Sequence, residues 1–211
     1  MKRFLPWLIL LLVVGGLCFV FPPFRVHSIK EVRAARAGQQ FNATDFVGRF
    51  WSEKLLPATT KATDAEQVLA VIVNSPTKVR EQFGKTVGVS SSYFLFVRGA
   101  GRVVSASDDN IGLSLKAEGD VAEVVVPLGL VFGNAVRDGT GLLDSSTYPN
   151  AQEFNDISAA LNSIVETNVL PQLQQMAKVG KRLQFAGCVE VADEESDLKP
   201  LKLVPISVKP E

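Results

Sequence analysis

The segment PLGLVFGNAVRDGTG, Pro127 to Gly141, gathers the residues best suited to hold a ligand. It contains four glycines, which permit sharp turns, and the opposite charges of Arg137 and Asp138 lie at the exit of a predicted strand. An arginine beside backbone amides can bind a small anion. This interpretation makes Arg137, Asp138 and Asn150 candidate ligand-binding residues at a strand-to-helix corner. The alternative is structural, with the two charges tying the strand end to a helix or to a barrel wall.

Patterns typical of catalytic and metal sites are missing from the sequence. The chain has one histidine, His27, and two cysteines, Cys18 and Cys188. One imidazole and one thiol in the soluble part cannot form a zinc or copper site of nitrogen and sulfur ligands. A Ser-His-Asp triad would lack a histidine inside a folded cleft, and no phosphate-binding glycine motif occurs. We therefore expect no catalytic residue, metal or cofactor, and we expect the protein not to be an enzyme.

The distribution of charge disfavours nucleic-acid binding. The formal net charge is zero, but residues 1–85 carry 12 Lys and Arg against 6 Asp and Glu, whereas residues 86–211 carry 10 against 16. A phosphate backbone requires a clustered positive field, which the C-terminal part does not provide. Phe94 and Phe96 could stack on bases, but they lie in the continuous apolar run YFLFV, which predicts burial.

An apolar run from Phe4 to Phe24 follows Lys2 and Arg3. About 20 apolar residues are long enough to span a bilayer as one helix. The run has the basic start and apolar centre of a secretory signal but no clear cleavage site. We therefore predict an uncleaved membrane anchor over residues 1–25, which inserts in the inner membrane through residues 4–24, and a juxtamembrane helix or linker over residues 26–40.

Cys18 raises the question of lipid attachment. A bacterial lipoprotein signal places a small residue immediately before its cysteine, whereas Leu17 stands there, and Phe19 continues the apolar run. We therefore predict that Cys18 is a small apolar residue of the membrane helix, with lipidation as the alternative. Arg25 and Lys30 follow the span, so the charge rule alone would place the soluble part in the cytoplasm. The signal-like architecture favours the periplasmic side, and we predict a single-pass protein of the bacterial cell membrane.

Residues 41–84 predict a layer of helices. Asn42 is a plausible N-cap, and Phe46, Phe50 and Trp51 give one apolar helical face that ends near Pro57. The pattern from Thr63 to Glu66 is typical of a capping box and opens a second helix. That helix is interrupted at Ser75 and Pro76 and ends by Gly84.

Residues 85–211 predict a β-barrel interrupted by one helix. Periodicity predicts that helix from about Gln152 to Val169, with Pro171 limiting or kinking it, and the two last strands meet across Asp193 to Asp197. Short β-branched or aromatic runs mark the strands: SSYFLFVRG and GRVVSAS, which are separated only by Ala100 and form the first strand, then IGLSLKA, AEVVVPLGLVF, KRLQFAGCVEVA and LKLVPISVK. Three strands, a helix and two strands is the order of the oligonucleotide/oligosaccharide-binding (OB) barrel. We predict an α+β fold, a small OB-like five-stranded barrel with an N-terminal helical layer, in a single soluble domain over residues 41–211. Another small barrel or an α+β sandwich is the alternative.

Several separated segments together resemble a bacterial family of unknown function whose members are described as periplasmic lipoproteins. The similar segments are FVGRFWSEKLLP, FVRGAGRVVSAS, PLGLVFGNAVRDGTG, EFNDISAALN and LQFAGCVEV. The resemblance implies an envelope location and proximity to sugar-uptake systems. It also implies that Gly133, Arg137 and Asp138 belong to a signature segment of the family, Pro127 to Gly141. It supplies no reaction and no catalytic residue. The chain departs from the family pattern before Cys18 and at Tyr148 to Ala151, where an aromatic residue and Asn150 are kept but a glutamine is lost.

The sequence therefore predicts a membrane-anchored periplasmic or envelope protein that acts as a non-enzymatic accessory. Its expected partner is a protein, such as a membrane transporter of a sugar-uptake system, or a small solute. Two alternatives stay open. An envelope enzyme would require polar groups that converge in a cleft. A nucleic-acid binder of the OB type would require a positive barrel face.

Overall fold

The computed structural model describes residues 41–211 apart from residues 89, 117 and 149, and Asn42–Glu211 form one compact unit. The predicted anchor over residues 1–25, the linker over residues 26–40 and Cys18 lie outside the described residues. Within residues 41–211, less those three positions, no helix is long and apolar enough to cross a membrane.

The first described helices form one continuous run, which ends at Lys61. Asn42 caps the run as predicted, because its Oδ1 accepts a hydrogen bond of 3.1 Å from the backbone N–H of Asp45. The α-helix ends at Ala58, which agrees with the predicted end near Pro57, and a 3-10 turn extends the run to Lys61. A proline ring collides with the carbonyl four residues before it, and the widened π turn immediately upstream relieves that collision. The segments are α3 (Ala43–Phe50), the π-helix η1 (Trp51–Leu55), α4 (Leu56–Ala58) and the 3-10 turn η2 (Thr59–Lys61).

A short strand and two helices complete the N-terminal part. The strand β1 (Thr63–Asp64) pairs in parallel with β2. Asp64 is the cap of α5 (Ala65–Asn74) in place of the predicted Thr63, because the helix begins at Ala65, and its Oδ1 accepts from Glu66 N at 2.9 Å. The predicted interruption follows α5, and α6 (Lys78–Phe83) ends at Gly84.

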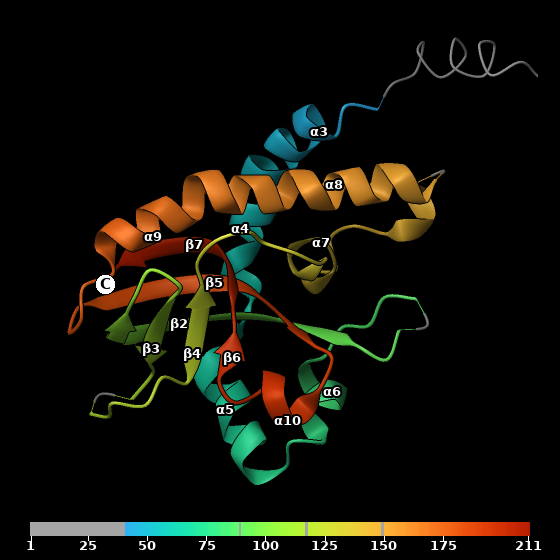
Figure 1. Ribbon diagram of the computed structural model, residues 1–211. Helices are drawn as coiled ribbons and strands as arrows, with labels where there is room; N and C mark the ends of the chain where they lie inside the picture. Colours follow the sequence, from blue (N-terminus) through green and yellow to red (C-terminus); the bar gives the residue numbers. More distant parts are fainter. Residues whose placement is uncertain (1–40, 89, 117, 149) are drawn as a thin grey trace, which may run out of the picture. The chain divides into compact units, whose positions relative to one another are not determined.

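The sheet closes on itself through the C-terminal segment (Figure 1). Its strands are β2 (Tyr93–Ala106), β3 (Asn110–Ser114), β4 (Val124–Pro127), β5 (Arg182–Val191), β6 (Leu201–Lys202) and β7 (Val204–Pro210). Their order is β6-β4-β3-β2-β5-β7, with β6 and β7 separated only by Leu203. The same chain segment therefore pairs with β4 at its start and with β5 along the rest, and Leu203 N donates to Val125 O at 2.8 Å. This closure gives the predicted α+β, OB-like fold. The described sheet has seven strands instead of the predicted five, because β1 adds a short strand and the last predicted strand is divided into β6 and β7 at Leu203.

The strand predicted to reach Phe132 is shorter, because β4 ends at Pro127. Proline cannot donate to a ladder, and Gly129 has a φ of +123°, outside the extended region. The chain instead leaves the sheet as a loop over residues 128–134. Phe94 and Phe96 are buried, as predicted.

Two layers of helices stack on the side of the sheet opposite α5 and α6 (Figure 1). The short helix α7 (Ala135–Gly139) packs on β2, β5 and β7, and the longer α8 (Ala151–Ile164) packs on α7 and α3 (Figure 1). The α8 helix continues through η4 (Val165–Val169), a π-helix, into α9 (Leu170–Met176). Pro171 therefore neither ends nor limits it, and again the π turn lies just before the proline. Two short elements remain, the 3-10 turn η3 (Ser145–Thr147) and α10 (Glu194–Asp197) between β5 and β6.

Candidate functional site

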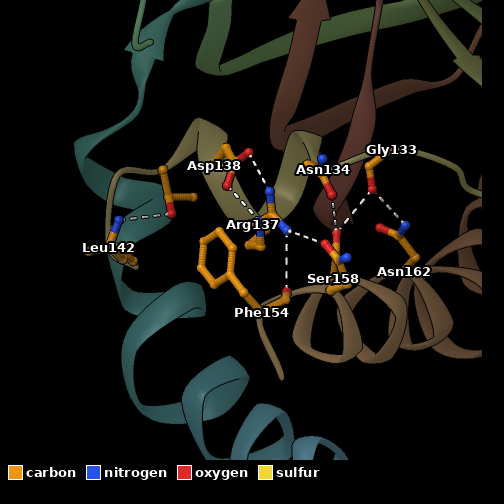
Figure 2. Close-up of polar contacts among 10 residues, drawn as sticks. Gly133, Asn134, Arg137, Asp138, Leu142, Phe154, Ser158 and Asn162 are labelled. Atoms are coloured by element: carbon orange, nitrogen blue, oxygen red, sulfur yellow. Dashed lines mark hydrogen bonds and ion pairs between the residues drawn. The ribbon is translucent and has the colours of Figure 1, made fainter. Parts of the chain in front are cut away.

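Arg137 and Asp138 form a buried ion pair on α7. Their exposed fractions are only 6% and 4%. The guanidinium donates from Nε to Asp138 Oδ1 at 2.7 Å and from Nη2 to Asp138 Oδ2 at 2.9 Å. Its Nη1 donates to the carbonyl of Phe154 at 3.3 Å, which joins α7 to α8 (Figure 2). The charged groups of both side chains therefore have their partners inside the protein.

Aromatic rings extend this contact to the N-terminal helix. The Arg137 guanidinium lies over the ring of Phe154, 3.8 Å from its centroid. Phe154 packs against Tyr148, and Tyr148 meets Phe46 of α3 edge to face, with centroids 6.3 Å apart. Burial raises the pKa of Tyr148. Contacts between aromatic rings therefore connect α3, Tyr148 and α8 beside the guanidinium.

Asn150 acts at the start of α8. Its Oδ1 accepts from Glu153 N at 2.8 Å, and its Nδ2 donates to Glu153 Oε1 at 2.9 Å. The side chain is exposed and serves as the N-cap. The structure thus brings Arg137 and Asp138 together, while the hydrogen bonds of Asn150 serve its own helix.

The loop over residues 128–134 is tied down at several points. Its start is fixed by Leu128 N, which donates to Asp109 O at 2.7 Å. Its middle is fixed by Val131 N, which donates to Glu166 Oε1 at 2.6 Å. At its end, the carbonyl of Gly133 lies 3.0 Å from Ser158 Oγ and accepts from Asn162 Nδ2 at 3.1 Å (Figure 2). The backbone of the loop is therefore held by the β2–β3 turn, by η4 and by α8.

The same loop displays two large apolar side chains to solvent. Leu130 is 74% exposed and Phe132 is 78% exposed. They flank Val131, whose backbone is fixed to Glu166. Exposed apolar side chains on a held backbone are typical of a surface that binds another molecule, because little conformational entropy is lost on contact.

Behind α7, the packing leaves no space for a side chain at Gly139. A Cβ placed there would lie 2.7 Å from the Sγ of Cys188 and 2.8 Å from its Cβ. Burial raises the pKa of the Cys188 thiol, the charge of Asp138 adds to this effect, and the ammonium of Lys85 opposes it. Lys85 Nζ itself donates to the carbonyl of Thr140. Cys188 is therefore a buried, protonated packing residue.

Glu190 lies beneath the end of the loop. Burial raises the pKa of its carboxyl, and the nearby charge of Asp138 raises it further. The backbone N–H of Asn134 donates to this carboxyl and partly offsets both effects. Gly133 has a φ of +82°, and a Cβ there would approach Glu190 Oε2 to 2.9 Å. The carboxyl and the loop therefore fit closely together.

An apolar groove of about 920 Å³ lies elsewhere, between α5 and the β3–β4 connection. Val73 and Val121, both largely exposed, stand on its two sides. Its charged neighbours are of both signs, including Glu66 and Lys116. Because the signs are mixed, charge does not select an occupant.

A family model described as "Predicted periplasmic lipoprotein (DUF2291)" matches residues 8–209. The chain belongs to this family. The resemblance inferred from the separated segments is thereby confirmed, and the family description indicates an envelope-associated, periplasmic location. A search of curated proteins finds no match.

A solved structure gives independent support for the fold. The crystal structure of an OB-fold protein from Thermotoga maritima MSB8 aligns with a TM-score of 0.72 and 23% sequence identity, over 82% of this chain and all of that one. At this identity the likeness concerns the fold.

The sequence patterns singled out this segment but did not predict that part of it is exposed. Residues 128–132 had the composition of a strand, and the signal that separates them from one is the pair Gly129 and Gly133, which brackets the apolar residues. The helix α7 was also missed, because five residues are too few for a helical period to be visible.

Proposed function

We propose that the protein is a non-enzymatic accessory of the bacterial envelope that binds a protein partner through the loop over residues 128–134. Residues 4–24 would hold it in the inner membrane, with the soluble part on the periplasmic side. A membrane transporter is the partner class suggested by the family resemblance. The observation that carries the proposal is the exposure of Leu130 and Phe132 on a loop whose backbone is tied down.

The buried half of the signature segment supports this assignment. Arg137 is occupied by Asp138, by Phe154 and by Asn155, whose Oδ1 lies 3.5 Å from Nη1. A guanidinium with these contacts serves better as a tether between α7 and α8 than as an anion site. That tether supports the end of the loop, since Gly133 and Asn134 immediately precede α7.

Carboxylates beside the loop define the chemistry of the partner. Glu166 accepts from Val131, Glu190 lies against Gly133, and the exposed Asp109 adjoins Leu128. An apolar pocket with lysine or arginine at its rim would complement this surface. The two apolar side chains would supply affinity, and the acidic surroundings would supply orientation.

The test is photo-crosslinking of the full chain in native bacterial membranes. A benzophenone amino acid replaces Phe132 in one variant, Leu130 in a second and Val179 in a third. Val179 is 64% exposed on the turn before β5 and is the matched control. The first two variants should give an adduct with the same protein, and the control should not.

Two further changes make the result specific. Leu130→Ser in the chain that carries the crosslinker at position 132 should abolish the adduct, and added salt should lower its yield because of the acidic surroundings. The proposal is contradicted if positions 130 and 132 give no common adduct, or if Val179 gives the same one.

A further inference from the structure

A polar hollow of about 390 Å³ lies on the sheet, and none of its lining residues belongs to the loop over residues 128–134. Three strands form its floor: β2, β5 and β7. The turn η2 and the start of β1 form its wall, through Thr59, Thr60 and Asp64. A hollow of this volume is at the lower end of the range for small-molecule sites, about 300 to 1,000 Å³.

Strand register explains why the hollow exists. Residues paired across neighbouring strands point to the same face, as do residues two apart on one strand. One row of paired residues is Arg98, Ala186 and Ser207, and the next row on that face is Ala100, Gln184 and Lys209. The two alanines leave an open centre between four longer polar side chains.

The polar groups around this centre are largely unused within the fold. Arg98 donates from Nε to Ala62 O at 3.2 Å, which fixes the side chain and leaves its two terminal nitrogens available. Among the described residues, Gln184, Ser207 and Lys209 make no side-chain hydrogen bond or ion pair. Asp64 is engaged in capping α5.

The remaining wall supplies acceptors. Thr59 and Thr60 donate their hydroxyl protons to the carbonyls of Leu56 and Pro57, at 2.6 and 2.9 Å. Their oxygens can still accept hydrogen bonds, as ligand hydroxyl groups would require. Two cations against one carboxylate give the hollow a positive balance.

We propose that this hollow binds a small carboxylate that also carries hydroxyl groups. The free end of Arg98 presents two parallel N–H groups, the geometry that a planar carboxylate accepts. Lys209, Gln184 and Ser207 contact the other oxygens, and the two threonines accept from the hydroxyls. This site goes beyond the partner-binding function and does not depend on the loop over residues 128–134.

The test is titration calorimetry on the full chain in a non-ionic detergent. D-Glucuronate is the probe, and D-glucose is its neutral match, with the same ring and no carboxylate. Glucuronate should bind at least about tenfold more tightly than glucose, because a charge-assisted bidentate contact is lost in the latter.

Variants locate the binding to the hollow. Lys209→Gln and Arg98→Gln should each weaken glucuronate binding, the arginine change by about tenfold or more. Ala100→Leu should abolish binding by filling the centre. Lys178→Gln, an exposed cation in the α9–β5 turn, should leave the affinity unchanged.

Three results would overturn the proposal. They are no detectable binding of glucuronate, equal affinity for glucose, and unchanged affinity in Lys209→Gln and Ala100→Leu variants that keep the thermal midpoint of the parent chain. The last pair of variants keeps the test decisive if Arg98→Gln disturbs the contact with Ala62. None of these results bears on crosslinking at Phe132.

Discussion

Residues of the signature segment take two different environments within a few positions of each other. Leu130 and Phe132 face solvent, whereas Arg137, Asp138 and Gly139 are buried between the sheet and α8. The exposed pair buries little apolar surface within the fold, and in our proposal it contacts the partner. The buried group is explained by packing, and the effect of each residue on folding follows from its contacts.

Gly139→Ala should destabilise the protein by about 1–3 kcal/mol, because the added methyl group collides with Cys188. Urea unfolding of the full chain measures the change. Gly48→Ala is the matched control, since a Cβ at Gly48 in α3 meets no atom within 4 Å. Equal effects of the two substitutions would mean that the close packing on Cys188 is absent.

Glu190→Gln should stabilise the protein at neutral pH. The pKa of Glu190 is raised in the folded state, so the folded protein binds a proton more readily than the unfolded chain, and stability falls as pH rises from the ordinary value of 4.5 through the raised one. The amide removes this cost while still accepting from Asn134. Thermal midpoints across this pH range should differ most above the raised pKa and converge below pH 4.5. Glu195→Gln, at an exposed position of α10, is the control for the removal of a negative charge.

Elements with a local signal were predictable, and elements set by packing were not. The cap at Asn42 and the interruption after α5 follow from residue types within a few positions. The continuation of the two helices past Pro57 and Pro171 does not, because each proline follows a π turn that no pattern of neighbouring residue types indicates. Closure by β6 and β7 is equally non-local, since it joins residues far apart in the chain.

The candidate site shows the same division. Sequence patterns singled out Arg137 and Asp138, because their residue types and their adjacency can be read directly from the sequence. They could not show that Phe154 and Tyr148 enclose the guanidinium, because these contacts arise only when α8 folds over α7. Asn150 was placed at the correct corner, and its cap to Glu153 became clear only from geometry.

Asn150→Ala should lower the free energy of unfolding by about 1 kcal/mol through loss of the N-cap of α8. Asn150→Asp should recover most of it, because its carboxylate can accept from the same N–H. Urea unfolding compares the three proteins. Loss of partner crosslinking with stability intact in Asn150→Ala would instead support a direct binding role.

At the scale of the molecule, helices pack around an OB-like barrel, and membership of the family indicates the periplasm. The barrel positions two separate surfaces, the loop over residues 128–134 and the polar hollow on β2, β5 and β7. The first is built for a protein partner in our proposal, and the second for a small anion.

The proposed anchor makes a prediction about mass. Protein extracted from native bacterial membranes should have an intact mass that includes the residues before Cys18, because Leu17 would prevent processing there. Mass spectrometry of the intact chain measures this. A shorter chain that begins at Cys18 and carries acyl groups would replace the helical anchor with a lipid one.

The central claim is that the buried half of the signature segment holds the fold and the exposed half binds. The most direct measurement is the free energy of urea unfolding for Arg137→Met and Phe132→Ser in the full chain, followed by fluorescence, to which the buried Trp51 contributes. Arg137→Met should lose about 3–5 kcal/mol, because Asp138 is left buried without its partner. Phe132→Ser should stay within about 0.5 kcal/mol of the parent chain. Unchanged stability of Arg137→Met, or unfolding of Phe132→Ser, would contradict the claim.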